Sequence, residues 1–121
     1  MLILKKESEA KRLGLKVMGY ISGYDYAGLE PHRMGLGPVY ATAKLFKRMN
    51  MNLSDIDLIE MNEAFAAQII ANLRAFESED FSKDFLNYDK KLGEIDLSRF
   101  NVNGGAIAPV SYTHLTLPTK A

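Results

Sequence analysis

The chain has 121 residues, of which 47% are hydrophobic and 25% are charged, with 15 basic and 15 acidic side chains. This composition is typical of one globular domain and excludes a disordered or fibrous chain. The balanced charge, without a basic stripe, argues against nucleic acid as a partner. No apolar run approaches the roughly 20 residues of a transmembrane helix. The start also lacks the features of a secretory signal, so we expect a cytoplasmic location.

The first predicted elements are a short strand, a short helix and a longer strand. Residues 2–4 form an apolar run, and a helical turn over 8–12 ends at Gly14, a residue favoured just past helix ends. Alternating apolar residues over 15–21 predict a strand that is buried mainly on one face. Residues 22–37 are rich in Gly and have no regular period, so we expect a long ordered loop.

Two amphipathic helices are predicted in the middle of the chain. The first covers 38–49, because Pro is tolerated as a first helical residue and apolar side chains recur at helical spacing after it. Ser54 and Asp57 resemble a helix-start pair that holds one short turn. Residues 58–61 then read as a strand, and Asn62 precedes the second helix. The apolar face of that helix consists of Phe65, Ile69, Leu73 and Phe76.

The remaining chain completes an α/β pattern. Residues 77–97 are charged but hold enough apolar side chains for a further surface helix that ends near Gly93. Residues 101–108 supply the last strand and the entry to a turn. The alternation of strands and helices predicts an α/β fold class with a mixed or parallel sheet flanked by helices.

Several candidate residues also have a purely structural interpretation. Asn62 before an amphipathic helix is a favoured N-cap, and Glu63 in a first helical turn is stabilised by the positive end of the helix dipole. Phe65 belongs to the core by periodicity. Met34 suits an acyl channel because its thioether is flexible and polarizable, but it could equally fill a gap in a loop. His32 and Arg33 are expected to be solvated loop charges.

No metal site is predicted. The chain has no cysteine, and its two histidines, His32 and His114, do not stand at metal-ligand spacing with carboxylates. Gly104 and Gly105 lack the Lys-Ser/Thr ending of a P-loop and the third glycine of a dinucleotide fingerprint. Close backbone approach and permissive φ angles explain these two glycines better.

Three short sequence strings follow one another along the chain: Met-Gly-Leu-Gly-Pro at 34–38, Met-Asn-Glu-Ala-Phe at 61–65, and Asn-Val-Asn-Gly-Gly-Ala-Ile-Ala at 101–108. Together they resemble the thiolase family. They match that family's Asn-Glu-Ala-Phe motif and the Gly-rich run that precedes its Gly-His-Pro loop. The resemblance implies a thiolase-like fold, with residues 1–108 as a partial C-terminal domain. The charged insertion over 77–97 most resembles the 3-ketoacyl-CoA thiolases of fatty-acid β-oxidation.

The resemblance also implies roles for single residues. Asn62 corresponds to the asparagine that holds an oxyanion-hole water for the thioester enolate, and such a donor contributes on the order of 3 kcal/mol to a transition state. Met34 borders the bound thioester, and Phe65 helps to line the pantetheine tunnel. The residues expected beside the active site in a structural role are Glu63, Gly104 and Gly105.

The implied reaction is a two-step acyl transfer. A cysteine thiolate attacks the 3-keto carbon of the substrate, acetyl-CoA leaves, and a second CoA takes the acyl group. The substrate is thus a coenzyme A thioester, no cofactor stays bound, and the family forms homodimers or homotetramers. This chain has no cysteine, so it is expected to be inactive alone.

The resemblance stops after Ala108, and residues 109–121 have neither helical nor strand periodicity. We interpret them as an out-of-frame or artefactual tail, so His114 does not take the role of the catalytic histidine. Residues 1–14 are a candidate end of the N-terminal domain. One alternative is a noncatalytic acyl- or CoA-binding module, which the missing cysteines favour. Another is complementation by a second chain that supplies the nucleophile and the histidine.

Overall fold

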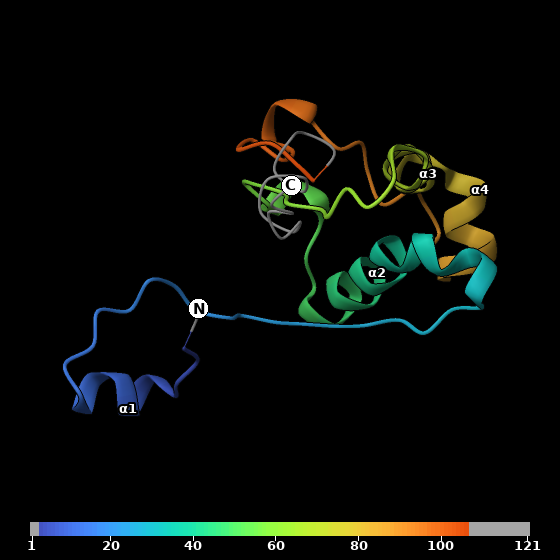
Figure 1. The fold of residues 1–121 in the computed structure, drawn as a ribbon. Coiled ribbons are helices and arrows are strands. Elements are labelled where there is room, and N and C mark those ends of the chain that lie inside the picture. The colour runs from blue at the N-terminus through green and yellow to red at the C-terminus, as the bar shows by residue number, and fades with distance from the viewer. Residues whose placement is uncertain (1–2, 107–121) are drawn as a thin grey trace, which may run out of the picture.

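The computed structural model describes residues 3–106 of the chain. A helical body contains α2 (Gly37–Met49), α3 (Ala66–Glu77) and the short α4 (Glu79–Phe81), while α1 (Glu7–Arg12) lies apart from this body (Figure 1). An extended segment over residues 15–30, the N-terminal arm, joins the two parts. No helix within residues 3–106 is long and apolar enough to cross a membrane.

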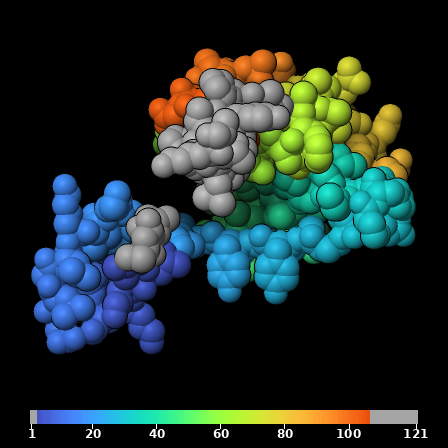
Figure 2. Space-filling model, in the orientation of Figure 1, coloured from blue at the N-terminus to red at the C-terminus, as the bar shows by residue number. Residues whose placement is uncertain are grey.

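The predicted strand over 15–21 is extended, but it pairs with no other strand in the described part of the chain. All of its side chains are exposed, whereas one buried face was expected. A strand buries a face only when neighbouring strands and a covering layer are present, and residues 3–106 place neither beside this segment. Figure 2 shows the N-terminal part standing out from the rest of the molecule.

Helix α2 confirms the helix predicted over 38–49 to within one residue. Pro38 occupies the first turn, where its missing N–H has no helical partner to lose. The helix ends at Asn50, whose φ of 52° is left-handed, a conformation that Asn tolerates better than most residues. Its buried residues are Val39, Ala43 and Phe46.

The turn after α2 is capped by other residues than those predicted. A 3-10 turn covers Leu53–Asp55, and Asn52 and Asp55, rather than Ser54 and Asp57, form the capping box. The N–H of Asn52 donates to Asp55 Oδ2 at 2.8 Å. The difference arises because Asn52 directly precedes the first helical residue, which is where a capping side chain can reach the free N–H groups.

The surface helix predicted over 77–97 is wrong in its extent. Helix α4 continues as one π-helical turn over Ser82–Leu86 and ends at Asn87, whose φ of 56° is left-handed. The chain then runs without a regular element as far as Leu97. Gly93 lies in this irregular part with a φ of 142°, where a Cβ atom would approach Leu53 Cδ2 to 2.9 Å. Gly93 therefore permits close packing instead of ending a helix.

The only β-pairing among the described residues is one parallel bridge between Ile59 and Phe100. The N–H of Ile59 donates to the carbonyl of Arg99, and the N–H of Asn101 donates to the carbonyl of Ile59, both at 2.9 Å. The strand predicted over 58–61 is reduced to this bridge, and its partner Phe100 precedes the strand predicted over 101–108. Residues 101–106 form no strand, and residues 107–108 lie outside the described part. The mixed sheet is thus not formed within residues 3–106.

The core lies between α2 and α3 and is completed by the segments that follow each of them. Phe46 from α2 and Phe76 from α3 are both buried, as their helical spacing predicted. Leu53 reaches the same cluster from the 3-10 turn after α2, and Ile95 from an irregular segment. Their sequence surroundings did not indicate this burial. The full buried cluster is Val39, Phe46, Leu53, Ala75, Phe76 and Ile95.

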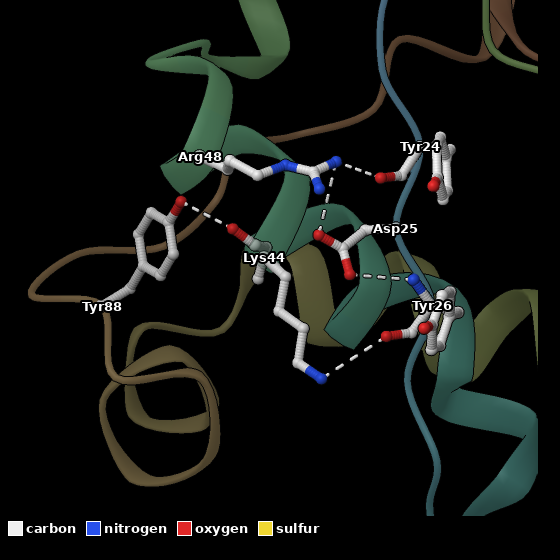
Figure 3. A network of polar contacts seen from close by, with 7 residues as sticks. Tyr24, Asp25, Tyr26, Lys44, Arg48 and Tyr88 are labelled. Carbon is white, nitrogen blue, oxygen red and sulfur yellow. Dashed lines mark hydrogen bonds and ion pairs between the residues drawn. The ribbon is translucent and has the colours of Figure 1, made fainter.

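The N-terminal arm is fixed to the body mainly through its own backbone carbonyls. Arg48 donates to the carbonyl of Tyr24 and lies 3.6 Å from Asp25, and Lys44 donates to the carbonyl of Tyr26 at 3.4 Å (Figure 3). Side chains of α2 thereby satisfy main-chain acceptors that a sheet neighbour would otherwise satisfy. The described contacts hold this part of the arm along α2.

On the other side of α2, Tyr88 donates its O–H to the carbonyl of Ala43 at 3.0 Å (Figure 3). Burial raises the pKa of the Tyr88 phenol above its ordinary value of 10.0. The folded state therefore favours the neutral form. The stability from this group is fully present below the unfolded pKa and is lost as pH rises through the higher folded pKa.

We expect the free energy of unfolding of the parent chain to fall as the pH rises above about 10, the ordinary pKa of tyrosine. The Tyr88→Phe variant should show a smaller fall over the same pH range. That variant should lose about 1 kcal/mol at neutral pH, because it no longer makes the hydrogen bond to Ala43. Urea unfolding at several pH values measures both effects. Parallel pH profiles for the two proteins would show that Tyr88 does not cause the alkaline loss.

Candidate functional site

Three segments that carry the predicted site residues meet around the start of α3. Residues 34–35 contact the first turn of this helix, since a Cβ atom added at Gly35 would lie 3.3 Å from Gln68 Cγ. Residues 61–65 lead directly into the helix, and residues 101–105 bind residues 61–63 through hydrogen bonds. The tertiary structure thus brings the described parts of the three sequence strings together at the start of α3.

Asn62 is exposed and stands four residues before the first residue of α3, Ala66. The interpretation of Asn62 as an N-cap is therefore wrong, because Phe65 occupies the N-cap position. The physical reason lies in the preceding residue, Met61, whose backbone is held in a bridge-like arrangement by Asn101. This arrangement keeps Asn62 outside the helix and exposed to solvent.

Glu63 also lies outside the helix, so its predicted place in the first turn is wrong. Its carboxylate Oε1 accepts a hydrogen bond from Asn101 Nδ2 at 2.7 Å. The backbone at Gly105 approaches the same carboxylate so closely that a Cβ atom there would overlap it. The residue acts as a tertiary link between the two segments instead of a dipole partner of α3.

The two glycines of the third string have different structural reasons. Gly104 has a left-handed φ of 88°, and its N–H donates to the carbonyl of Asn101 at 2.8 Å in a tight turn. Gly105 leaves room for the Glu63 carboxylate. These are the permissive φ angle and the close approach expected from the sequence, one at each glycine.

Met34 lies in a 3-10 helix over Pro31–Leu36, and its side chain is 70% exposed. The neighbouring carbonyl of Gly35 accepts a hydrogen bond from Asn72 Nδ2 at 2.7 Å, and the same nitrogen donates to the carbonyl of Gln68 at 2.8 Å. Asn72 is fully buried within α3. It therefore anchors the Met34 segment to the helix that follows Asn62.

Phe65 is 68% exposed, so its assignment to the core by periodicity is wrong. Its backbone is extended, with φ of −144°, and the helical period begins only at the next residue. Phe65 and Met34 are thus two large apolar side chains presented to solvent from segments that adjoin the start of α3. Exposed apolar side chains near a polar group are one feature of ligand sites.

The start of α3 has no side-chain cap. The first N–H groups of an uncapped helix point out along its axis and favour negative charge nearby. An exposed amide at Asn62, a positive helix end and two apolar side chains could together receive an acyl group with a polarised carbonyl. A polar donor with apolar side chains nearby has the chemistry that stabilisation of an enolate requires.

The two basic residues of the Met34 segment do not share one environment. His32 is exposed and lies 3.3 Å from a carboxylate oxygen of Glu30. Arg33 does not fit the prediction of a solvated charge, because its guanidinium lies over the ring of Phe85 at 4.5 Å. Residues 3–106 bring together no group of three His, Asp or Glu side chains that could hold a metal ion.

Sequence reasoning missed Asn72 and Asn101, the two asparagines that hold the site together. Asn72 interrupts the apolar face of its helix, which was the one available signal of a buried polar contact. Asn101 begins the third sequence string, but nothing there indicated its partners, which lie about 40 positions earlier in the chain. A separate surface hollow involves none of the motif residues. It is lined by Phe46, Lys47, Asn50, Met51, Asn52, Asn87, Tyr88 and Asp89.

Comparison with known proteins places the chain beside one group of enzymes. Residues 15–111 match the family described as "Thiolase, C-terminal domain". A 3-ketoacyl-CoA thiolase of Colwellia psychrerythraea is 46% identical over 108 residues, which cover 88% of this chain and 25% of that protein. A 3-ketoacyl-CoA thiolase of Aliivibrio fischeri is 44% identical over 108 residues, with 88% and 24% covered. The chain thus spans about a quarter of the length of these relatives.

Solved structures agree with the sequence matches. The human mitochondrial 3-ketoacyl-CoA thiolase matches with a TM-score of 0.65 and 37% identity, over 84% of this chain and 22% of that one. The peroxisomal 3-ketoacyl-CoA thiolase of Saccharomyces cerevisiae matches with a TM-score of 0.65 and 38% identity, over 84% and 24%. The human protein has also been solved in complex with CoA.

Proposed function

Because this chain belongs to the thiolase family and carries part of its C-terminal domain, we propose that it supplies the enolate-stabilising part of an acyl-CoA acyltransferase. The whole enzyme converts a 3-ketoacyl-CoA and CoA into a shortened acyl-CoA and acetyl-CoA, as in fatty-acid β-oxidation. The coenzyme A thioester is a substrate rather than a bound cofactor. The proposal includes a cytoplasmic location and assembly into homodimers or homotetramers.

The observation that carries this proposal is the exposed position of Asn62 before α3. Its amide is exposed beside the uncapped start of α3, while its two neighbours are held by Asn101. In the proposed role, Asn62 holds a water that donates to the thioester oxygen as negative charge develops there. A donor fixed before the reaction costs no reorganisation when the charge appears.

The proposal gives Met34 and Phe65 the apolar contacts with the substrate. Both are large, exposed and close to the start of α3. Met34 borders the thioester and Phe65 lines the path of the pantetheine chain. Glu63, Gly104 and Gly105 stay in structural roles, since their described contacts join the site segments to each other.

The exposed arm supports a wider domain assignment. Residues 15–22 form an extended, fully exposed stretch, which we assign to a mixed sheet whose other strands come from polypeptide outside residues 3–106. Residues 1–108 then form part of the C-terminal domain, with residues 1–14 as a candidate end of the preceding domain. The proposed tail over residues 109–121 lies outside the described residues, and the family match ends at residue 111.

A second candidate function is a noncatalytic acyl- or CoA-binding module. The absence of cysteine from the chain favours it, because the thiolase reaction needs a thiolate nucleophile. Titration of CoA and acetoacetyl-CoA into the 121-residue chain by calorimetry discriminates the two functions. Binding by the isolated chain favours the module, and binding only within a larger thiolase favours the enzyme part.

A hybrid enzyme tests the proposed function directly. Residues 3–106 replace the aligned segment of the Colwellia psychrerythraea 3-ketoacyl-CoA thiolase, which keeps its own remaining sequence. We expect the hybrid to catalyse thiolysis of acetoacetyl-CoA. The loss of the substrate's enolate absorbance measures the rate. The 121-residue chain alone should show no turnover, because it has no cysteine to form the acyl-enzyme. A folded hybrid that binds CoA but shows no thiolysis would contradict the proposal.

A further inference from the structure

The side chain of Asn101 replaces two backbone bonds of a parallel strand pair. The bridge between Ile59 and Phe100 has its usual bonds on both sides of Ile59. Continuing the ladder would require Met61 to bond to the main chain of residue 101 and beyond. Instead, Asn101 Oδ1 accepts from the N–H of Met61 at 2.8 Å, and Asn101 Nδ2 donates to the carbonyl of Met61 at 3.0 Å.

The backbone of Asn101 is unable to make these bonds because it has turned away from the ladder. Its φ of 47° is left-handed, a conformation in which Asn is several-fold enriched. Its carbonyl accepts from the N–H of Gly104 at 2.8 Å and so closes a turn. The side chain thereby keeps Met61 in a strand-like position while the main chain of residues 101–105 folds toward Glu63.

The same amide nitrogen also donates to Glu63 Oε1 at 2.7 Å. A single side chain therefore binds both neighbours of Asn62, one through its backbone and the other through its carboxylate. A hydrogen bond to a charged acceptor is about twice as strong as a neutral one. The backbone at Gly105 also lies directly against this carboxylate.

From this geometry we propose that Asn101 is a positioning residue that sets the orientation of Asn62 by clamping Met61 and Glu63. The inference rests on the proposed function, because Asn62 is the group being positioned. Asn101 itself does not touch the substrate. Any residue that cannot both accept from Met61 and donate to its carbonyl breaks the clamp.

The test is amide hydrogen exchange by NMR on the ¹⁵N-labelled 121-residue chain. Asn101→Asp keeps the size and the acceptor, but it loses the donor and places a second carboxylate beside Glu63. We expect repulsion between the two carboxylates to move the side chain at position 101 away from Met61, so that the Met61 amide loses about tenfold or more of its protection. Asn103→Asp makes the same chemical change at an exposed position of the same turn and should leave Met61 unchanged.

The double variant Asn101→Asp with Glu63→Gln exchanges the donor and the acceptor between the two side chains. It should recover part of the Met61 protection, a result that general destabilisation does not produce. The amide of Val39 in the core reports whether the variants stay folded. An unprotected Met61 amide in the parent chain, or equal protection in Asn101→Asp, would overturn the clamp.

Kinetics in the hybrid enzyme separate the clamp from the proposed function. Asn101→Asp should lower kcat by about tenfold or more with little change in KM, because the displaced donor acts on the transition state. Faster exchange at Met61 with an unchanged kcat upholds the clamp and contradicts the role of Asn62. Unchanged exchange contradicts the clamp whatever the rate.

Discussion

Replacement of Asn62 by Ala in the hybrid thiolase is expected to lower kcat by about 100- to 1,000-fold. The exposed amide is the one group of the described chain to which we assign stabilisation of the enolate oxygen, through the water that it holds. Its removal takes away an interaction that strengthens as charge develops, so kcat and kcat/KM should fall together. Steady-state thiolysis of acetoacetyl-CoA measures both constants.

Two controls make this expectation specific. Asn103→Ala removes an exposed amide from a neighbouring turn and should leave kcat unchanged. Asn62→Asp keeps the size but puts a negative charge where the enolate forms, so its rate should be no higher than that of Asn62→Ala. A rise in KM at constant kcat would show that Asn62 contributes only uniform binding.

The largest effect on stability is expected from Phe76→Ala. Phe76 is 2% exposed and lies in the cluster that joins α3 to α2. Truncation of a buried Phe costs about 3–5 kcal/mol, through lost transfer free energy and the cavity left behind. This is a large share of the roughly 5–15 kcal/mol by which whole domains are stable. Urea unfolding of the 121-residue chain, followed by circular dichroism, measures the change.

Phe65→Ala is the matched control, since it makes the same chemical change at a site that is 68% exposed. It should change the free energy of unfolding by less than about 0.5 kcal/mol. If Phe76→Ala is already unfolded without urea, Phe76→Leu supplies a milder substitution with a measurable midpoint. Equal losses at both positions would contradict the described core.

Local sequence signals predicted α2 closely because each of them acts over one or two helical turns. Pro38 fits only a first turn, and Val39, Ala43 and Phe46 recur at helical spacing. When the helical period of α3 is extended back to Phe65, it wrongly assigns this residue to the core. Periodicity cannot show where a helix begins when tertiary hydrogen bonds hold the preceding residues outside it.

The candidate site shows the same division. The types of its residues were apparent from the strings around Met34, Asn62 and Gly104. Their mutual positions were not, because they depend on Asn72 and Asn101. These two asparagines bond to backbone atoms up to 40 positions away. No local pattern encodes which distant carbonyl a buried amide will meet.

The sequence by itself determined the family, helix α2 with its buried residues, the burial of Ile69 and Phe76 in α3, and the absence of cysteine from these 121 residues. The tertiary structure decided that Asn62 stands outside its helix, that Glu63 binds Asn101, and that Phe65 faces solvent. The physical reason is range. Helix propensity and apolar period act between near neighbours, whereas backbone groups freed by a turn are satisfied by whatever side chain the fold brings to them.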